Sequence, residues 1–288
     1  MVDRVTELSA DEIKQAVRRA LEEDIGSGDA TTLATIPENQ IARGSIVARE
    51  NLVVAGIAPA EAAFAELSGA VRCERVVVDG KKVVAGEKIL TVTGPARPIL
   101  TAERVALNFL QRLSGIATLT RHFVDAVAGT PVKILDTRKT TPGWRRFEKY
   151  AVACGGGQNH RIGLFDLILI KDNHLAALRD EKPNPIAAAV ARARKKFPAL
   201  QIEVEADTSI QVEQAVAAGA DIVLLDNMNL DELRSAVKLV GGRAKTEASG
   251  GVNLQTVRAM AATGVDFISV GALTHSARAT DIGLDFDI

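Results

Sequence analysis

The chain has 288 residues, 47% of them hydrophobic and 25% charged, and its net charge at pH 7 is −1. This composition is typical of a globular protein of one large or two smaller domains, and it excludes a global electrostatic footprint for nucleic acid or an anionic membrane. The sequence has no run of 18 apolar residues and no apolar signal region at its N-terminus. We therefore expect no membrane span, no secretion and no nucleic-acid partner.

The two cysteines, Cys73 and Cys154, lie far apart in the sequence and form no CxxC motif. We expect two buried free thiols rather than a disulfide or a metal site. Free thiols suit a reducing compartment, so a cytoplasmic location is predicted.

The chain begins with a helical pattern and then becomes largely extended. Ser9 and Glu12 have the spacing of a capping box, and the apolar residues that follow predict a helix over 10–23. From 43 to 92 short β-rich runs dominate, which indicates an N-terminal α+β domain.

Three local signals subdivide the rest of this half. A helix is predicted at 59–67, and Asp79-Gly80 is typical of a hairpin turn. Helical periodicity returns over 98–127, where we expect Gly115 to separate two helices.

The second half repeats one unit, a β-rich run that ends in a polar residue or glycine and is followed by a helix. The runs are VKILD, DLILIK, QIEVE, DIVLLD, AKTEASGG and DFISVG, with helices predicted at 186–196 and 209–218. Apolar strands alternating with helices indicate a parallel sheet with right-handed crossovers, so the pattern predicts a β/α barrel. Only six strands are visible instead of eight, so the barrel is expected to be incomplete or irregular.

In a barrel the carboxyl ends of the strands meet on one face, where loops carry the functional groups. We therefore expect side chains far apart in the sequence to converge there: Asp136, Arg138, Lys139, Lys171, Glu205, Asp226, Ser249 and Gly271.

Cations are concentrated in this half, since residues 133–174 contain eight Lys or Arg against four acids. This local excess predicts an anionic small-molecule ligand. His160 and Arg161 follow three glycines and precede a strand, which indicates a loop at the barrel mouth. Lys139 or Lys171 would also suit a Schiff-base lyase.

Two glycine elements follow the last two strands, and loops at that place in a barrel commonly bind phosphate through backbone N–H groups. They are Ser249-Gly250-Gly251 and Val270-Gly271-Ala272. Glu205 and Asp226 end neighbouring strands beside them. These two acids would hold Mg²⁺ mostly through water, contact sugar hydroxyls, or form structural ion pairs.

Several blocks of the sequence match one family in order: LEEDIGSGDATT, ERVALNFLQRLSGIAT, DTRKTTPG, EKYAV, GGGQNHR, LILIKDNH, IEVEADT, LLDNM, EASGGV and VGALTHS. With these blocks the chain resembles the quinolinate phosphoribosyltransferases, the decarboxylating enzymes of NAD biosynthesis, over essentially its whole length. The resemblance implies a sandwich-like α+β domain and an open, seven-stranded α/β barrel. We place them at 1–114 and 115–275, and expect the tail 276–288 to pack on the first.

The resemblance also implies an activity. Phosphoribosyl would pass from phosphoribosyl pyrophosphate (PRPP) to quinolinate with decarboxylation, giving nicotinate mononucleotide, pyrophosphate and CO₂, with Mg²⁺ and no organic cofactor. Members of the family are dimers or higher assemblies in which one arginine enters the partner's site. By motif that arginine is Arg104, so a homodimer or hexamer with shared sites is expected.

Motif by motif, the resemblance assigns the site. The positions that surround quinolinate are Thr137, Arg138, Lys139, His160, Arg161 and Lys171. Those near Mg²⁺ and the ribose are Glu205 and Asp226, and the 5′-phosphate contacts are the two glycine elements, 249–251 and 270–272.

Burying a dicarboxylate without paired cations is prohibitive, so the surplus of cations favours quinolinate over a monocarboxylate. Three alternatives stay open: a paralogue that uses nicotinate, the Schiff-base lyase, and a carrier-type module suggested by VVVDGKKVVAGEKILTVTG. The last lacks the Met-Lys-Met expected around a biotinylated lysine.

Overall fold

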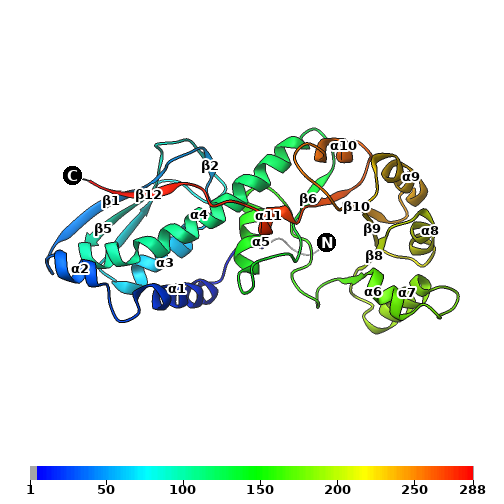
Figure 1. Ribbon diagram of the computed structural model, residues 1–288, viewed down its shortest axis with the longest axis horizontal. Helices are drawn as coiled ribbons and strands as arrows, with labels where there is room; N and C mark the ends of the chain where they lie inside the picture. The colour runs from blue at the N-terminus through cyan, green and yellow to red at the C-terminus, as the bar shows by residue number, and fades with distance from the viewer. Residues whose placement is uncertain (1–4, 288) are drawn as a thin grey trace. The chain divides into compact units, whose positions relative to one another are not determined.

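The computed structural model describes residues 5–287 and divides into two compact units (Figure 1). Unit 2 contains residues 5–121, 146–156 and 276–287, whereas unit 1 contains residues 122–145 and 157–275. The first division falls after residue 121, and the segment 146–156 belongs with the N-terminal part of the chain.

An antiparallel sheet lies at the centre of unit 2, with the strand order β12-β1-β5-β3. Its strands are β1 (Ile41–Ala48), β3 (Arg72–Arg75), β5 (Lys88–Pro95) and β12 (Ile282–Phe286). Strand β1 pairs with both β5 and β12, so the C-terminal strand lies beside an N-terminal one, as Figure 1 shows. A separate pair consists of β2 (Leu52–Val53) and β4 (Lys82–Val83).

Helices α1 (Ala10–Ile25), α2 (Ala30–Thr35) and α3 (Ile57–Leu67) lie in unit 2, and α4 (Ala96–Ala126) and α5 (Arg145–Cys154) lie mostly in it. The predicted helices correspond to α1, α3 and α4, whereas α2 and α5 were not predicted. Helix α1 begins with the expected capping box, in which Ser9 and Glu12 satisfy each other's backbone N–H groups.

The turn at Asp79-Gly80 is not a hairpin, so that prediction was wrong. Strand β3 pairs with β5 and β4 pairs with β2, so the strands on either side of the turn are not neighbours. The Asp79 carboxylate accepts hydrogen bonds from the backbone N–H groups of Gly56 and Ile57, at 3.0 and 3.2 Å. It thereby satisfies free N–H groups at the start of α3, where a negative charge is favourable.

Gly115 does not separate two helices, because α4 runs without interruption for 31 residues. A Cβ atom at this position would lie 1.9 Å from the carbonyl oxygen of Arg278. The glycine therefore permits close passage of the C-terminal segment rather than ending the helix.

A parallel sheet forms unit 1, with the strand order β6-β11-β10-β9-β8-β7. Its strands are β6 (Lys133–Leu135), β7 (Ile168–Ile170), β8 (Ile202–Ala206), β9 (Ile222–Asp226), β10 (Lys245–Ser249) and β11 (Phe267–Ser269). The helices are α6 (Asp172–Ala177), α7 (Pro185–Lys196), α8 (Ser209–Ala217), α9 (Leu230–Val240), α10 (Val257–Ala261) and α11 (Ala272–His275). Every pairing in this sheet is parallel, as the alternation of strands and helices predicted.

A single parallel bridge extends this sheet beyond β6. Leu135 pairs with Gln158, and the backbone of Gln158 exchanges hydrogen bonds with Ile134 and Asp136 at 2.8 and 3.1 Å. Within residues 5–287 the parallel sheet thus has six strands and this one bridge, whereas the resemblance implied seven strands.

Both cysteines are free thiols, although they are partly exposed rather than buried. Burial of the sulfur still raises the pKa of Cys73 to about 11 and that of Cys154 to about 12, so both thiols are poor nucleophiles. Among the described residues, no helix has the length and apolarity needed to cross a membrane.

Candidate active site at the carboxyl ends of the parallel strands

Alternate side chains of a strand share one face, and the register of the sheet shows which side chains of neighbouring strands lie level. Glu205 on β8 and Glu247 on β10 both lie level with Leu224 on the strand between them. Glu203 lies two residues below Glu205 on the same face. Three carboxylates from two strands therefore share one face of the sheet.

Lys171 follows β7 and reaches the neighbouring strand. Its Nζ lies 3.1 Å from Oε2 of Glu205, while its backbone N–H donates to Nδ1 of His174 at 2.9 Å. The Lys171 side chain is 47% exposed, so the ammonium group has room to meet a ligand as well as Glu205.

Lys139 follows β6 and lies over the glycine element after β11. A Cβ atom on Gly271 would come within 3.1 Å of the Lys139 Cδ and of the His275 Nε2. The hydroxyl of Thr274 donates to the Lys139 carbonyl at 2.7 Å, which ties this loop to α11. Gly271 therefore lets the Lys139 and His275 side chains pass close to its backbone.

Hydrogen bonds made by Asn227 join the ends of β9 and β10. The backbone N–H of Asn227 donates to the Ser249 carbonyl at 3.0 Å, and its side-chain amide donates to Asp226 at 2.7 Å. Asn227 and Gly250 both have positive φ, of 55° and 93°. A Cβ atom on Gly250 would lie 2.1 Å from the Asn227 Oδ1, so only glycine fits there.

His160 is fixed from several sides. The buried carboxylate of Asp136 accepts the backbone N–H of His160 at 2.8 Å and the side-chain amide of Asn159 at 2.7 Å. The imidazole Nε2 then lies 3.0 Å from Oε2 of Glu203 and 3.6 Å from Oε2 of Glu247. Neither acid was predicted to belong to the site, although a charged residue in the run IEVEA was a usable signal for Glu203.

Two arginines, Arg138 and Arg161, add positive charge to the site. Arg161 is 6% exposed, and its Nη1 donates to the Leu167 carbonyl at 3.2 Å. Burial, followed by the charge of Arg138, lowers the pKa of Arg161 from its usual value. The Nε of Arg138 is itself buried and makes no hydrogen bond within the described chain. Closely spaced guanidinium groups disfavour each other's charge, and an anionic ligand would relieve that cost.

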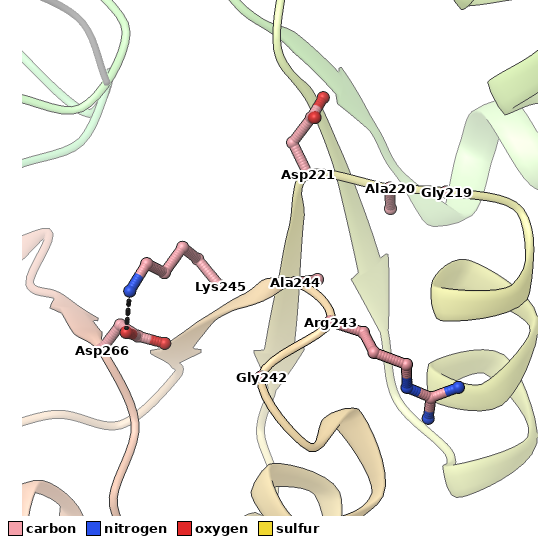
Figure 2. A pocket seen from close by; sticks show the side chains of 8 residues that line it. All are labelled: Gly219, Ala220, Asp221, Gly242, Arg243, Ala244, Lys245 and Asp266. Atoms are coloured by element: carbon pink, nitrogen blue, oxygen red, sulfur yellow. Dashed lines mark hydrogen bonds and ion pairs between the residues drawn. The ribbon is translucent and has the colours of Figure 1, made fainter.

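A cavity of unit 1 lies at the other end of the strands (Figure 2). It measures about 410 Å³ and is lined by Gly219, Ala220, Asp221, Gly242, Arg243, Ala244, Lys245 and Asp266. Figure 2 shows Lys245 paired with Asp266, at 2.7 Å, and Arg243 directed away from both.

The remaining charges of this cavity are also paired. Asp221 accepts from Arg194 at 2.8 Å and from the Ile202 N–H at 2.7 Å, and Arg243 donates to the carbonyls of Leu239 and Val240. The charged groups of this cavity are thus paired with one another or with the backbone, and none of them has a buried polar atom without a partner, so we place the functional site at the carboxyl ends.

Comparison with known proteins bears on what this arrangement does. Residues 29–114 match the model of the quinolinate phosphoribosyl transferase N-terminal domain, and residues 116–285 match that of the C-terminal domain. The chain belongs to the quinolinate phosphoribosyl transferase family.

Relatives span nearly the whole chain. A nicotinate-nucleotide pyrophosphorylase (carboxylating) of Mycobacterium leprae is 45% identical over 281 residues, which are 96% of this chain and 97% of the relative. A probable nicotinate-nucleotide pyrophosphorylase (carboxylating) of Bacillus subtilis is 44% identical over 95% of this chain and 93% of its own. The solved nicotinate-nucleotide pyrophosphorylase of Francisella tularensis covers 100% of both chains at 40% identity, with a TM-score of 0.94.

Within unit 1 some of the residues that the family resemblance assigned lie in contact. Contacts join Lys171 to Glu205 and Lys139 to Gly271. The hydroxyl of Thr137 accepts the Lys139 N–H at 3.0 Å, so it shapes the loop. Arg104 is exposed on α4 and belongs to unit 2.

Three cations of the 133–174 segment have structural surroundings. Arg145 donates to the Thr140 hydroxyl and the Ile162 carbonyl, at 3.1 and 3.0 Å, and Arg146 pairs with Glu12 at 2.7 Å. Lys149 is completely buried in α5. These three charges were expected to be solvated or structural, and Lys149 is structural.

Glu205 and Asp226 suit the hard oxygen ligation that Mg²⁺ prefers. Both are partly exposed at strand ends, and their carboxylates are engaged by Lys171 at 3.1 Å and by the Asn227 amide at 2.7 Å. Because each carboxylate keeps solvent access, the pair fits an ion held largely through water and the oxygens of a ligand.

Proposed function

We propose that this chain transfers the phosphoribosyl group of PRPP to quinolinate with loss of CO₂, giving nicotinate mononucleotide and pyrophosphate for NAD biosynthesis. One observation carries the proposal within the family. Cationic side chains from three separate segments lie at the carboxyl ends of the parallel strands, where Arg138 has a buried, unpartnered Nε.

The substrate class follows from charge. Quinolinate has two adjacent carboxylates, and removing them from water requires fixed cations with hydrogen-bond donors. Arg138, Lys139, Arg161 and Lys171 supply four cations, whereas nicotinate has only one carboxylate to neutralise. This surplus supports the diacid as the substrate.

Positioning and neutralisation account for the chemistry. The pyridine nitrogen displaces pyrophosphate at the anomeric carbon, and the carboxylates of Glu205 and Asp226 stabilise the oxocarbenium character that develops. The quaternised ring nitrogen then accepts the electron pair of the breaking bond to the adjacent carboxylate, which leaves as CO₂. A proton on the ring carbon completes the product.

We further propose that Glu205 and Asp226 hold Mg²⁺, largely through water, together with the pyrophosphate of PRPP. When bound, this ion neutralises charge on the leaving pyrophosphate. The glycine elements at 249–251 and 270–272 would offer backbone N–H groups to the 5′-phosphate, since Gly250 has no room for a side chain and Gly271 keeps the backbone open beside Lys139.

The decisive assay offers quinolinate and nicotinate separately with PRPP and Mg²⁺, and measures nucleotide and CO₂. We expect turnover of quinolinate with one CO₂ per nucleotide. Turnover of nicotinate without CO₂ would overturn the substrate assignment, and an adduct trapped by borohydride on Lys139 or Lys171 would support a Schiff-base lyase instead.

We also propose a homo-oligomer in which Arg104 enters the partner's site. Its exposed position on α4 supports a role outside its own chain. Arg104→Ala and Lys139→Ala, each inactive alone, should regain at most about a quarter of wild-type activity when mixed and allowed to exchange subunits, because one site of each mixed dimer is then intact. Absence of recovery after demonstrated exchange would contradict a shared site.

A further inference from the structure

Two loops of unit 1 carry most of the cations assigned to quinolinate. The first loop, 136–144, follows β6 and contains Arg138 and Lys139, whereas the second loop, 157–167, precedes β7 and contains Arg161. Burial lowers the pKa of Arg161, as does the charge of Arg138. The guanidinium groups of the two loops are therefore close enough to repel each other, so contacts elsewhere are needed to hold the loops together before an anion binds.

One cross-link joins the loops at the residues that precede these cations in the sequence. The carboxylate of Asp136 accepts the backbone N–H of His160 at 2.8 Å and the side-chain amide of Asn159 at 2.7 Å. Asp136 comes before Arg138 in the first loop, and His160 comes before Arg161 in the second. A cross-link at this end alone would leave each loop free to pivot about it.

A second cross-link joins the loops at the residues that follow the cations, and Arg145 makes it. Its Nε donates to the hydroxyl of Thr140 at 3.1 Å, and its Nη1 donates to the carbonyl of Ile162 at 3.0 Å. Thr140 directly follows Lys139, and Ile162 directly follows Arg161. The cations of both loops thus lie between two points of attachment, which fixes the loops relative to each other.

Each acceptor of this second cross-link is also held within its own loop. The backbone N–H of Thr140 donates to the Arg138 carbonyl at 2.9 Å. In the second loop the Asp166 carboxylate accepts the N–H groups of Ile162 and Gly163, at 2.7 and 2.9 Å. A displacement at either end of the cross-link therefore moves residues directly beside a cation.

The chemistry of the cross-link requires the side chain of arginine. A guanidinium group is planar and has five N–H donors in fixed directions, so one side chain can donate to two loops at once. Both acceptors of Arg145 are neutral oxygens, a hydroxyl and a carbonyl. The contacts of this residue therefore use the geometry of its donors and neutralise no acid.

We propose that Arg145 is a positioning residue of the quinolinate subsite, where it holds the two loops at the spacing that lets Arg138 and Arg161 bind one dicarboxylate together. Two adjacent carboxylates have a fixed separation, so the cations that bind them need a matching one. Arg145 acts through these two arginines and does not touch the ligand. The identity of the ligand rests on the proposed function, whereas the cross-link does not.

The first test needs no substrate, because the single tryptophan of the chain, Trp144, directly precedes Arg145 in the first loop. Acrylamide quenching of its fluorescence measures how freely this end of the loop opens. We expect Arg145→Gln and Thr140→Val to raise the quenching constant about twofold, since both cut the cross-link. The matched control is Arg146→Gln, whose arginine pairs with Glu12 at 2.7 Å, and it should quench as wild type. Unchanged quenching in the first two variants, or an equal rise in the control, would overturn the cross-link.

Steady-state kinetics tests the consequence for binding. Arg145→Gln should raise the KM for quinolinate about tenfold and change kcat and the KM for PRPP by less than about threefold, because binding of one substrate is lost. Arg146→Gln should retain the wild-type constants. A residue with only a structural role would lower Tm without this division between the two KM values. A wild-type KM for quinolinate in Arg145→Gln, or an equal rise for PRPP, would contradict the proposal.

Arg145→Lys separates donor geometry from charge. Lysine keeps the positive charge, but its compact ammonium does not reproduce two donors in fixed directions, so its KM for quinolinate should resemble that of Arg145→Gln. A KM near wild type would show that the charge alone is needed and the positioning role wrong.

The other end of the cross-link gives an independent variant. Thr140→Val should raise the KM for quinolinate about threefold, and the double variant with Arg145→Gln should be no worse than Arg145→Gln alone, because both changes cut one connection. Additive increases would refute it. If Arg145→Gln does not fold, Thr140→Val decides in the same assays. If wild type does not turn over quinolinate, the substrate proposal fails, while the quenching of Trp144 still decides whether the cross-link exists.

Discussion

The two ends of the parallel strands in unit 1 use charged residues for opposite purposes. At the amino ends, Asp221 and Asp266 each accept a backbone N–H from the preceding strand of the chain, and each has a basic partner, Arg194 or Lys245. At the carboxyl ends, Arg138 keeps a buried nitrogen without a partner and Lys171 is half exposed beside Glu205.

The two ends differ in whether their polar groups have hydrogen-bond partners, rather than in charge or cavity volume. The amino end has a cavity of about 410 Å³, yet its polar groups bind one another and the backbone. Unsatisfied buried groups are costly to keep, and the carboxyl end keeps them where a ligand can supply the missing partners. Cavity volume is therefore a weaker indicator of function here than buried polar groups without partners.

The largest difference in kcat/KM should be between substitutions of two lysines at opposite ends of β6. Lys133 begins β6 and Lys139 follows its carboxyl end, and both are exposed. Lys139→Gln should lower kcat/KM by about a hundredfold, because it removes a cation directed at developing or bound charge. Lys133→Gln should behave as wild type in the same steady-state assay. Similar losses in both variants would abolish the distinction between the two ends.

Two lysine–carboxylate pairs make the next comparison, Lys171–Glu205 at 3.1 Å and Lys245–Asp266 at 2.7 Å. Lys171→Gln should lower kcat/KM by about tenfold or more, since a charged contact to substrate is lost. Lys245→Gln should leave kinetics unchanged and cost at most about 1 kcal/mol, as expected for an exposed ion pair. Denaturant unfolding and kinetics on the same preparations will separate the effects. An activity loss in Lys245→Gln would assign function to the amino end.

Glycines offer a smaller contrast. In Gly271→Ala the new Cβ would press on Lys139 and His275 at 3.1 Å, and displacement of the lysine should lower kcat/KM about tenfold with little change in Tm. Gly219, at the amino end, has φ +80° and open space around it, so Gly219→Ala should cost about 1 kcal/mol of stability through backbone strain and leave activity intact. The reverse pattern would contradict the division of roles.

The smallest effect concerns acid stability. Burial raises the pKa of Asp266, but hydrogen bonds from Lys245 and Thr246 outweigh it, so the net pKa is lowered below 3.8. The resulting stability is present above that value and is lost as the pH falls through the folded-state pKa. Asp266→Asn should therefore lower the free energy of unfolding by about 1 kcal/mol at pH 6, and the deficit should shrink below about pH 4. A deficit that is constant with pH would mean that the carboxylate charge is not involved.

Much of this organisation was readable in the sequence because its causes are local. The capping box at Ser9 and Glu12 and the run DIVLLD, which forms β9, each specify an element within a few residues. Parallel strands then bring their carboxyl ends together by topology alone, so Lys171 and Glu205 were expected on one face before any contact was known.

Contacts between distant segments were not readable in this way. Gly115 has the local sequence signal of a helix break, but it lies within one helix and leaves room for the backbone of Arg278. Asp79-Gly80 has the signal of a hairpin turn, but its flanking strands pair with other strands.

The chain by itself determined the α/β class, the repeated strand-helix unit, the family and the cations that precede or follow each strand, because periodicity, capping and motif spacing act over short distances. Only the tertiary structure decided which ionisable groups meet. Glu203 and Glu247 are separate acids in two strands until the register places both at the imidazole of His160.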